Sequence, residues 1–175
     1  MSSENEVRMS RSSVKTKPNN GMRILLFVMA IAVGYVCFTI VYDLRVRIIN
    51  HFELSNIAEA NEQVGQTLSN FIADVERETD WKVEIVSGRR SKEAQIQLKR
   101  DNPKNAAVNK SRHVLGRAID IFLYKRVGFN LIELRKFSSK AAWIESGVPE
   151  ISKRYGLLWG GTYKNYHDPV HFEVN

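Results

Sequence analysis

The feature that most constrains this chain is an uninterrupted apolar run from Ile24 to Tyr42, which holds no charged residue and no proline. As a helix rising about 1.5 Å per residue it would measure roughly 28 Å, close to the thickness of a bilayer core. A cleaved signal peptide is disfavoured because the run ends in bulky residues, Phe38 to Tyr42, instead of small ones. A buried core helix is disfavoured because the run lacks a polar face. We therefore expect a transmembrane helix over residues 24–42.

Basic residues flank this run unequally. Five precede it and two follow within the next twenty residues: Arg8, Arg11, Lys15, Lys17 and Arg23 before, Arg45 and Arg47 after. The positive-inside rule then makes residues 1–23 a cytoplasmic basic tail, unstructured over most of its length. Residues 43–56 are expected to form a juxtamembrane connector, and residues 57–175 a folded domain on the extracytoplasmic, periplasmic side of the membrane.

The periodicity of apolar residues after the run mixes helices and strands without a regular βαβ repeat. Ser91 is a suitable N-cap for the second predicted helix, and Pro149 is suited to open the last. The fold class is therefore α+β, a small domain with a short antiparallel sheet and flanking helices. We expect helices over 56–79, 91–100, 131–146 and a short stretch from Pro149, and strands over 81–86, 117–124, 157–159 and 170–174.

Charge and composition limit the classes of molecule that the domain is expected to bind. The net charge is +7, which favours nucleic acid, anionic lipid or anionic wall polymers. The basic residues are dispersed and no nucleic-acid reader motif is present, so we do not expect a nucleic-acid partner. The single cysteine, Cys37, permits no intrachain disulfide, and neither a phosphate loop nor a serine nucleophile elbow is found.

Histidine and carboxylate residues gather in two short stretches, 111–120 and 159–173. Zinc hydrolases use three nitrogen or oxygen ligands and keep one position open. His113 and Asp120 would lie roughly 23 Å apart along a straight strand, so the chain must turn between them, and Gly116 allows that turn. His171 is the third candidate ligand.

Two neighbouring residues are not expected to be ligands. His167 and His171 would need a helix to face one metal, and Pro169 disfavours a helix through them. Asp168 precedes that proline, and its carboxylate could exchange a proton with a metal-bound water. Each of these residues, taken alone, could instead be an ordinary hydrogen-bonding residue of the fold.

The two stretches closely resemble the zinc D-alanyl-D-alanine carboxypeptidase and L-alanyl-D-glutamate endopeptidase family, which includes vancomycin-resistance peptidases and phage endolysins. The family pattern Ser-x-His-x-x-Gly-x-Ala-x-Asp is matched from Ser111 to Asp120, and a later acidic-x-x-His-Phe-Glu pattern from Asp168 to Glu173. Ser87-Gly88-Arg89-Arg90-Ser91, followed by Gln95, resembles a third family stretch, although an aromatic residue is usual at Arg89.

The resemblance covers residues 57–175 and implies zinc held by His113, Asp120 and His171. It also implies that Asp168 acts as general base and then acid, and that Arg90 stabilises the oxyanion. Glu173 would orient His171 from behind, while Trp159, Gln95 and Ser111 would contact the substrate. Trp159 could equally be a core residue, and Arg90 could be an ordinary surface cation. The implied substrate is the peptide stem of bacterial peptidoglycan, cleaved in endolysin-like lysis or in remodelling of the wall.

Alternatives stay open at this point. Trp159-Gly160-Gly161 favours the endopeptidase branch, but Thr162 and Tyr163 depart from its usual acidic residue and Trp. A D-alanyl-D-alanine carboxypeptidase and a non-catalytic, membrane-anchored wall-binding module are the other readings. The small residues of the anchor, among them Ala30 and Gly34, loosely resemble the weak anchors of phage lysis enzymes that later leave the membrane. The oligomeric state is not predicted.

Overall fold

A computed structural model of the chain describes residues 19–175. The first 18 residues, most of the predicted basic tail, lie outside the described part. The chain divides into two compact units, Met1–Val41 and Tyr42–Asn175. Helix α1 (Asn20–Ala60) begins in the first unit and is the one described helix long and apolar enough to cross a membrane. It includes the whole of the predicted span.

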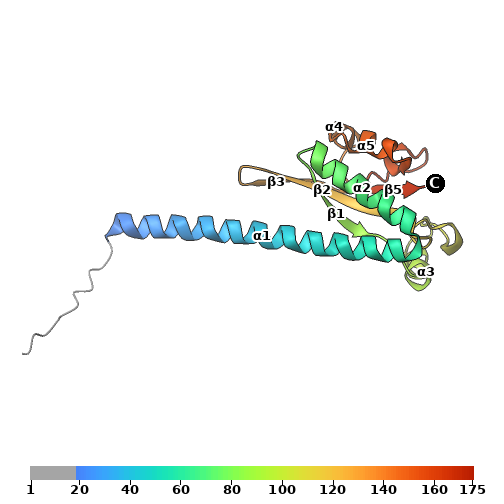
Figure 1. Ribbon diagram of the computed structural model, residues 1–175, viewed down its shortest axis with the longest axis horizontal. Coiled ribbons are helices and arrows are strands. Elements are labelled where there is room, and N and C mark those ends of the chain that lie inside the picture. The colour runs from blue at the N-terminus through green and yellow to red at the C-terminus, as the bar shows by residue number, and fades with distance from the viewer. Residues whose placement is uncertain (1–18) are drawn as a thin grey trace, which may run out of the picture. The chain divides into compact units, whose positions relative to one another are not determined.

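The second unit is built on a five-stranded antiparallel sheet, which confirms the predicted α+β class (Figure 1). Its central strand, β2 (Ala118–Val127), pairs along one edge with β1 (Lys82–Ser87). Along the other edge β2 pairs first with β5 (His171–Val174) and then with β3 (Asn130–Leu134), while β4 (Leu157–Trp159) lies outside β5.

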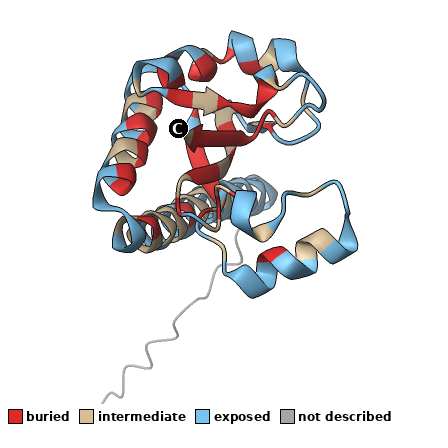
Figure 2. Ribbon diagram, turned by 90° about the vertical axis from the view of Figure 1, so that its right-hand side faces the viewer, coloured by how far each residue is buried: buried red, intermediate tan, exposed pale blue. Residues whose placement is uncertain are grey.

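One face of this sheet packs against helices and forms the core. Ile119, Ile121 and Leu123 alternate toward that face and are fully buried. The ring of Phe71 on α2 (Glu62–Glu78) packs against the ring of Phe172 on β5, with 5.3 Å between the ring centroids. Figure 2 shows the buried residues gathered on the strands and on the inward sides of the helices around them. The remaining elements of this unit are α3 (Lys92–Asp101), η1 (Val108–Lys110), α4 (Lys140–Glu145), α5 (Val148–Arg154) and η2 (Gly160–Thr162).

The alternate residues of β2 and β5 face away from this core. Asp120, Ala118 and Phe122 share this second face on β2, and His171 and Glu173 share it on β5. The sheet therefore has an apolar face that stabilises the unit and a polar face. The polar face carries the Asp120 and Glu173 carboxylates and the His171 imidazole.

The outer edge of β1 is covered by side chains instead of another strand. Asn50 of α1 donates to the Val83 carbonyl at 2.7 Å and accepts from the Ile85 amide at 2.8 Å. Glu76 of α2 accepts from the Val83 amide at 3.2 Å. These bonds satisfy main-chain groups that an edge strand would otherwise expose. The last part of α1 is thus an integral layer of the second unit.

The predicted helix over 56–79 is wrong in its continuity, because the chain breaks at Asn61. Asn61 is extended, with φ −159°, and its side chain accepts from the Val64 amide as the N-cap of α2. The break folds α2 back against α1, where Gly65 approaches Ala58 so closely that a Cβ would lie 2.6 Å from the Ala58 Cβ. Apolar spacing alone does not reveal this interruption.

The predicted helix over 131–146 is wrong in its first part. Residues Asn130–Leu134 form β3, the second strand of a hairpin with β2, and only Lys140–Glu145 is helical. Gly128 turns the hairpin with φ +61°. Leu131 and Leu134 fit one helical face equally well, so the long-range pairing with β2 decides the outcome. The predicted N-cap at Ser91 and the helix opened by Pro149 are confirmed.

We expect Asn50→Ala to lower the free energy of unfolding by about 2 kcal/mol, because two main-chain groups of β1 lose their partners. Denaturant unfolding of the full chain in detergent micelles, followed by tryptophan fluorescence, measures this. Asn70→Ala on the exposed face of α2 is the control and should change stability by less than about 0.5 kcal/mol. Equal stability of both variants would mean that the β1 edge does not depend on Asn50.

Candidate metal centre and active site

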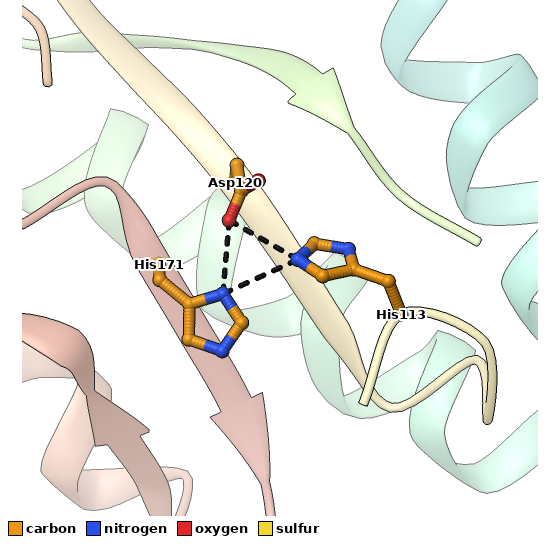
Figure 3. A group of neighbouring side chains, drawn as sticks. All are labelled: His113, Asp120 and His171. Atoms are coloured by element: carbon orange, nitrogen blue, oxygen red, sulfur yellow. Dashed lines mark hydrogen bonds and ion pairs between the residues drawn. The ribbon is translucent and has the colours of Figure 1, made fainter. Parts of the chain in front are cut away.

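The three predicted ligands come from three segments and meet on the polar face of the sheet (Figure 3). Asp120 on β2 and His171 on β5 are direct partners in the antiparallel register. His113 lies in the turn that precedes β2, where the amides of Gly116 and Arg90 donate to its carbonyl at 3.1 Å. Gly116 has φ +64°, so the turn predicted between His113 and Asp120 uses glycine's conformational freedom.

The donor atoms form a compact triangle. Asp120 Oδ1 lies 2.9 Å from His171 Nδ1 and 3.2 Å from His113 Nε2, and the two nitrogens are 3.2 Å apart. Ligand atoms about 2.0–2.1 Å from a tetrahedral metal stand roughly 3.3 Å from each other. Two imidazoles and one carboxylate at this spacing therefore fit a zinc ion that keeps one open position.

Each histidine is oriented by a bond on its other nitrogen. His113 Nδ1 lies 2.8 Å from the carbonyl oxygen of Gly88, and His171 Nε2 lies 3.0 Å from Glu173 Oε2. Both partners accept hydrogen bonds, so each of these nitrogens carries a proton. When a metal binds and displaces any proton on the facing nitrogens, this arrangement leaves the lone pairs of His113 Nε2 and His171 Nδ1 for the metal.

The charges of the cluster are strongly coupled. Burial opposes ionisation of Asp120, yet hydrogen bonds from His113 and His171 hold its pKa well below the usual range. Burial also opposes a charge on His171, but Asp120 and Glu173 outweigh it and raise the pKa of His171 to about 9. In the metal-free protein a proton on His171 therefore compensates the two carboxylates beside it.

Asp168 lies in the turn before β5, as predicted, and its carbonyl accepts from the His171 amide at 3.2 Å. Its carboxylate oxygen Oδ1 is buried and has no hydrogen-bond partner among the described residues. Burial, and secondly the charge of Asp120, raises the pKa of Asp168. A buried oxygen without a partner and with increased proton affinity is suited to exchange protons with a bound water.

The Trp159-Gly160-Gly161 motif positions Asp168 and His171. A side chain at Gly160 would collide with the Asp168 carbonyl and would lie 3.1 Å from the His171 Cβ. Trp159 is 5% exposed, and its indole nitrogen donates to the Pro169 carbonyl at 2.8 Å. Its substrate-binding role stays a prediction, while its contacts indicate that it supports the turn that carries Asp168.

Arg90, Gln95 and Ser111 form a hydrogen-bonded group behind His113. Gln95 Oε1 accepts from Arg90 at 2.8 Å and from Ser111 at 3.1 Å, and its amide nitrogen donates to Ala106. Arg90 also donates to Ser87 Oγ at 2.9 Å. Gln95 and Ser111 are 2% and 3% exposed, so their side chains are occupied inside the protein. Their predicted substrate contacts stay predictions, and their geometry favours positioning Arg90.

Two supports of the site were not predicted from the sequence. The Gly88 carbonyl holds His113, and a main-chain atom leaves no compositional signal. The Tyr163 hydroxyl interacts with the Glu173 carboxylate, and burial, followed by the charge of Glu173, raises the pKa of Tyr163. Tyr163 lies in the second histidine-rich stretch, 159–173, but its spacing from Glu173 does not predict a contact between the two.

We expect His113→Ala to abolish stoichiometric zinc binding, because two ligands remain where three are needed. Elemental analysis of the purified full chain after dialysis against zinc gives the metal content. His167→Ala is the matched control, since His167 is exposed and outside the cluster, and it should keep one zinc per chain. Loss of zinc in both variants would argue against this assignment.

Zinc affinity should increase with pH between 6 and 8. The His171 pKa of about 9 means that zinc must displace a proton throughout this range. One displaced proton changes affinity by about tenfold per pH unit. The raised pKa stabilises the metal-free fold fully below about pH 6.5, and this contribution is lost as pH rises through 9. Competition with a chelating dye measures the affinity, and a flat profile would contradict the proton displacement.

The chain is similar to known proteins in part of its sequence and in its fold. Residues 104–174 match the family model described as D-alanyl-D-alanine carboxypeptidase. No curated protein matches the chain. Among solved structures, an L-Ala D-Glu endopeptidase of Serratia marcescens, ChiX, is similar at 20% identity, with a TM-score of 0.47, over 62% of this chain and 77% of that one. The match to the family model confirms the predicted resemblance over residues 104–174, which include His113, Asp120, Asp168 and His171.

Proposed function

We propose that this chain is a membrane-anchored, zinc-dependent peptidase that hydrolyses the peptide stems of bacterial peptidoglycan. The observation that carries the proposal is the triangle of His113, Asp120 and His171, with the buried oxygen Oδ1 of Asp168, which has no hydrogen-bond partner among the described residues, on the adjoining turn. A purely structural cluster would not need a fourth residue with such an oxygen, because a buried polar atom without a hydrogen bond costs free energy. The family match supports the proposal, because residues 104–174, which match the D-alanyl-D-alanine carboxypeptidase model, include all four residues.

The residues of the chain divide the catalytic work. Zinc held by His113, Asp120 and His171 would supply a Lewis acid that polarises the scissile carbonyl and acidifies a water. Asp168, with its raised pKa, would accept the proton of that water and deliver it to the leaving amine. Glu173 would keep the His171 ring in place through the 3.0 Å bond to Nε2.

Arg90 is proposed to stabilise the negative charge that develops on the carbonyl oxygen. It lies at a cavity of about 290 Å³ whose lining includes Arg89 and Lys92. Three cations around one cavity favour a substrate that carries carboxylates, as peptidoglycan stems do. Gln95 and Ser87 hold the Arg90 guanidinium, which reduces the loss of side-chain freedom when substrate binds.

For the bond cleaved, we propose the amide between L-alanine and D-glutamate. The Trp159-Gly160-Gly161 motif supports this endopeptidase assignment. Gly160 is required by the close approach of Asp168, and Gly161 by the close approach of the Trp159 ring. A D-alanyl-D-alanine carboxypeptidase is the second candidate, because the matching family model carries that description. The two candidates share the same site and differ in where the substrate chain continues beyond it.

The anchor is proposed to be the apolar part of α1, residues 24–42, with the N-terminus in the cytoplasm. The greater number of basic residues before the span supports this orientation. The catalytic unit would then lie on the periplasmic side, where it has access to the wall. Cell-wall lysis and wall remodelling are the two roles compatible with this placement.

Asp168→Asn should retain zinc but lower the rate of wall digestion by about 10²–10⁴-fold, because the amide cannot accept the proton of the attacking water. Purified peptidoglycan is digested with the full chain in detergent, and the zinc content is measured in parallel. Asp101→Asn, at the exposed end of α3, is the control and should digest normally. Near-normal turnover of Asp168→Asn would exclude Asp168 as the base.

Mass spectrometry of the same digest distinguishes the candidate activities. New amino-terminal D-glutamate and carboxy-terminal L-alanine identify the endopeptidase, whereas release of a single D-alanine identifies the carboxypeptidase. A zinc-loaded protein that releases neither, but sediments with insoluble wall, would be the non-catalytic binding module instead.

A further inference from the structure

The β2–β3 hairpin ends in an apolar tip that the active site does not use. Its exposed residues are Val127, Phe129, Leu131 and Ile132, with exposed fractions of 55%, 83%, 43% and 40%. The hairpin projects from the rest of the sheet (Figure 1). Four apolar side chains together at a projecting turn are unfavourable in water and mark a contact surface.

Contacts within the second unit place this tip beside the point where the anchor ends. Arg126, one residue before Val127, pairs with Asp43 at 2.9 Å, and Asp43 directly follows the apolar run. The Tyr124 hydroxyl lies 3.3 Å from the same Asp43 carboxylate, and the Tyr124 ring packs edge-on at 5.2 Å from Tyr42. The end of β2 is therefore held at the level of Tyr42 and Asp43.

The direction of the hairpin follows from contacts farther along α1. Asn50 bonds to Val83 and Ile85 of β1, which pair with Leu123 and Ile121 of β2. This part of α1 therefore runs antiparallel to β2: residue 43 lies beside the tip end of β2, and residue 50 lies beside the end of β2 nearer to Asp120. The tip therefore lies past Asp43, at the Tyr42 end of the part of α1 that belongs to the second unit.

We propose that the hairpin tip, residues 127–132, inserts into the headgroup region of the same lipid bilayer that α1 crosses. This inference rests on the proposed membrane anchor and not on the catalytic assignment. A span that ends at Tyr42 puts the bilayer surface at Asp43, so residues beyond Arg126 meet lipid. Phe129 and the aliphatic side chains would bury apolar area among the acyl chains.

The charges around the tip suit an anionic bilayer. Lys125 and Arg126 on β2 and Arg45 and Arg47 on α1 lie at this end of the unit, and the Arg45 side chain is 62% exposed. Basic residues beside an apolar insertion add electrostatic attraction to anionic headgroups. Asp43 offsets one of these charges through its pair with Arg126, and Glu84, 3.8 Å from Arg45, partly offsets a second.

A second membrane contact would fix the height of the active site. Asp120 precedes Val127 by seven residues of β2, which at about 3.3 Å per residue sets the metal centre roughly 23 Å from the tip. A single span would leave the catalytic unit able to tilt, whereas the span and the hairpin together would hold it in one orientation. Stem peptides within this distance of the membrane would then be the accessible substrates.

Depth-dependent fluorescence quenching tests the insertion. The full chain with Cys37→Ser carries either Phe129→Cys or Phe137→Cys, each labelled with the polarity-sensitive fluorophore NBD. Both variants are reconstituted into vesicles of phosphatidylethanolamine and phosphatidylglycerol that contain lipids with a nitroxide near the headgroup. Phe137 is the matched control, because it is 96% exposed and lies past the far end of β3.

The expected result is a blue-shifted emission and severalfold stronger quenching at position 129 than at position 137. Equal, weak quenching at both positions in protein that floats with the vesicles would overturn the insertion. Failure to float would refute the anchor, and with it this proposal, while zinc binding and wall digestion would be unaffected. A further sample of the Phe129→Cys protein is left unlabelled and treated with a mild oxidant; disulfide cross-linking between copies, together with weak quenching in the labelled sample, would overturn the insertion and show that a second copy covers the tip.

Discussion

The antiparallel register between β2 and β5 is the constraint on which the site depends. It sets Asp120 opposite His171, fifty-one residues later in the chain, and sets Ala118 opposite Glu173. A shift of one residue would move His171 and Glu173 to the apolar face and Phe172 to the polar one. Phe172 prevents that shift, because its ring is fully buried against Phe71 and Trp143. The packing of the core on one side of the sheet therefore fixes the geometry of the candidate metal ligands on the other.

Support for the site extends outward from this register in two directions. Toward β4, Gly160 has no side chain, so the turn that carries Asp168 can approach it. The Trp159 indole nitrogen donates a hydrogen bond to the Pro169 carbonyl of the same turn. Toward β1, Gln95 joins Arg90 to Ser111, and the main chain of Arg90 bonds to His113. The general-base candidate and the oxyanion candidate thus approach the metal cluster from separate segments, each fixed by groups that have little contact with water. A site arranged in this way pays its ordering cost during folding and not during binding.

The sequence predicted those parts of the molecule whose signals are local. Ser91 predicts a helix start because its side chain can cap the first turn, and Pro149 because its ring suits a first turn. The spacing between His113 and Asp120 required the turn that the structure contains at Gly116. The β2–β3 hairpin was missed because Leu131 and Leu134 satisfy a helical period as well as a strand, and only the pairing with β2 distinguishes the two. The break at Asn61 and the Gly88 contact to His113 depend on tertiary approach in the same way. The metal-ligand and catalytic roles themselves stay predictions for the experiments above, although the three ligand candidates do meet in space.

The two histidines of the cluster are held by partners of different kinds, with a consequence for how such a site can change over time. The partner of His113 is a peptide oxygen, which no substitution removes as long as the backbone keeps its course, although a side chain at position 88 would have to displace the Glu53 side chain. The partner of His171 is the carboxylate of Glu173, which a single nucleotide change can remove. The orientation of His113 therefore depends on the backbone fold, whereas the hydrogen bond to His171 depends on one replaceable side chain. Descendants of this chain can tune the electron donation of His171 by exchanging residue 173 while the orientation of His113 remains untouched.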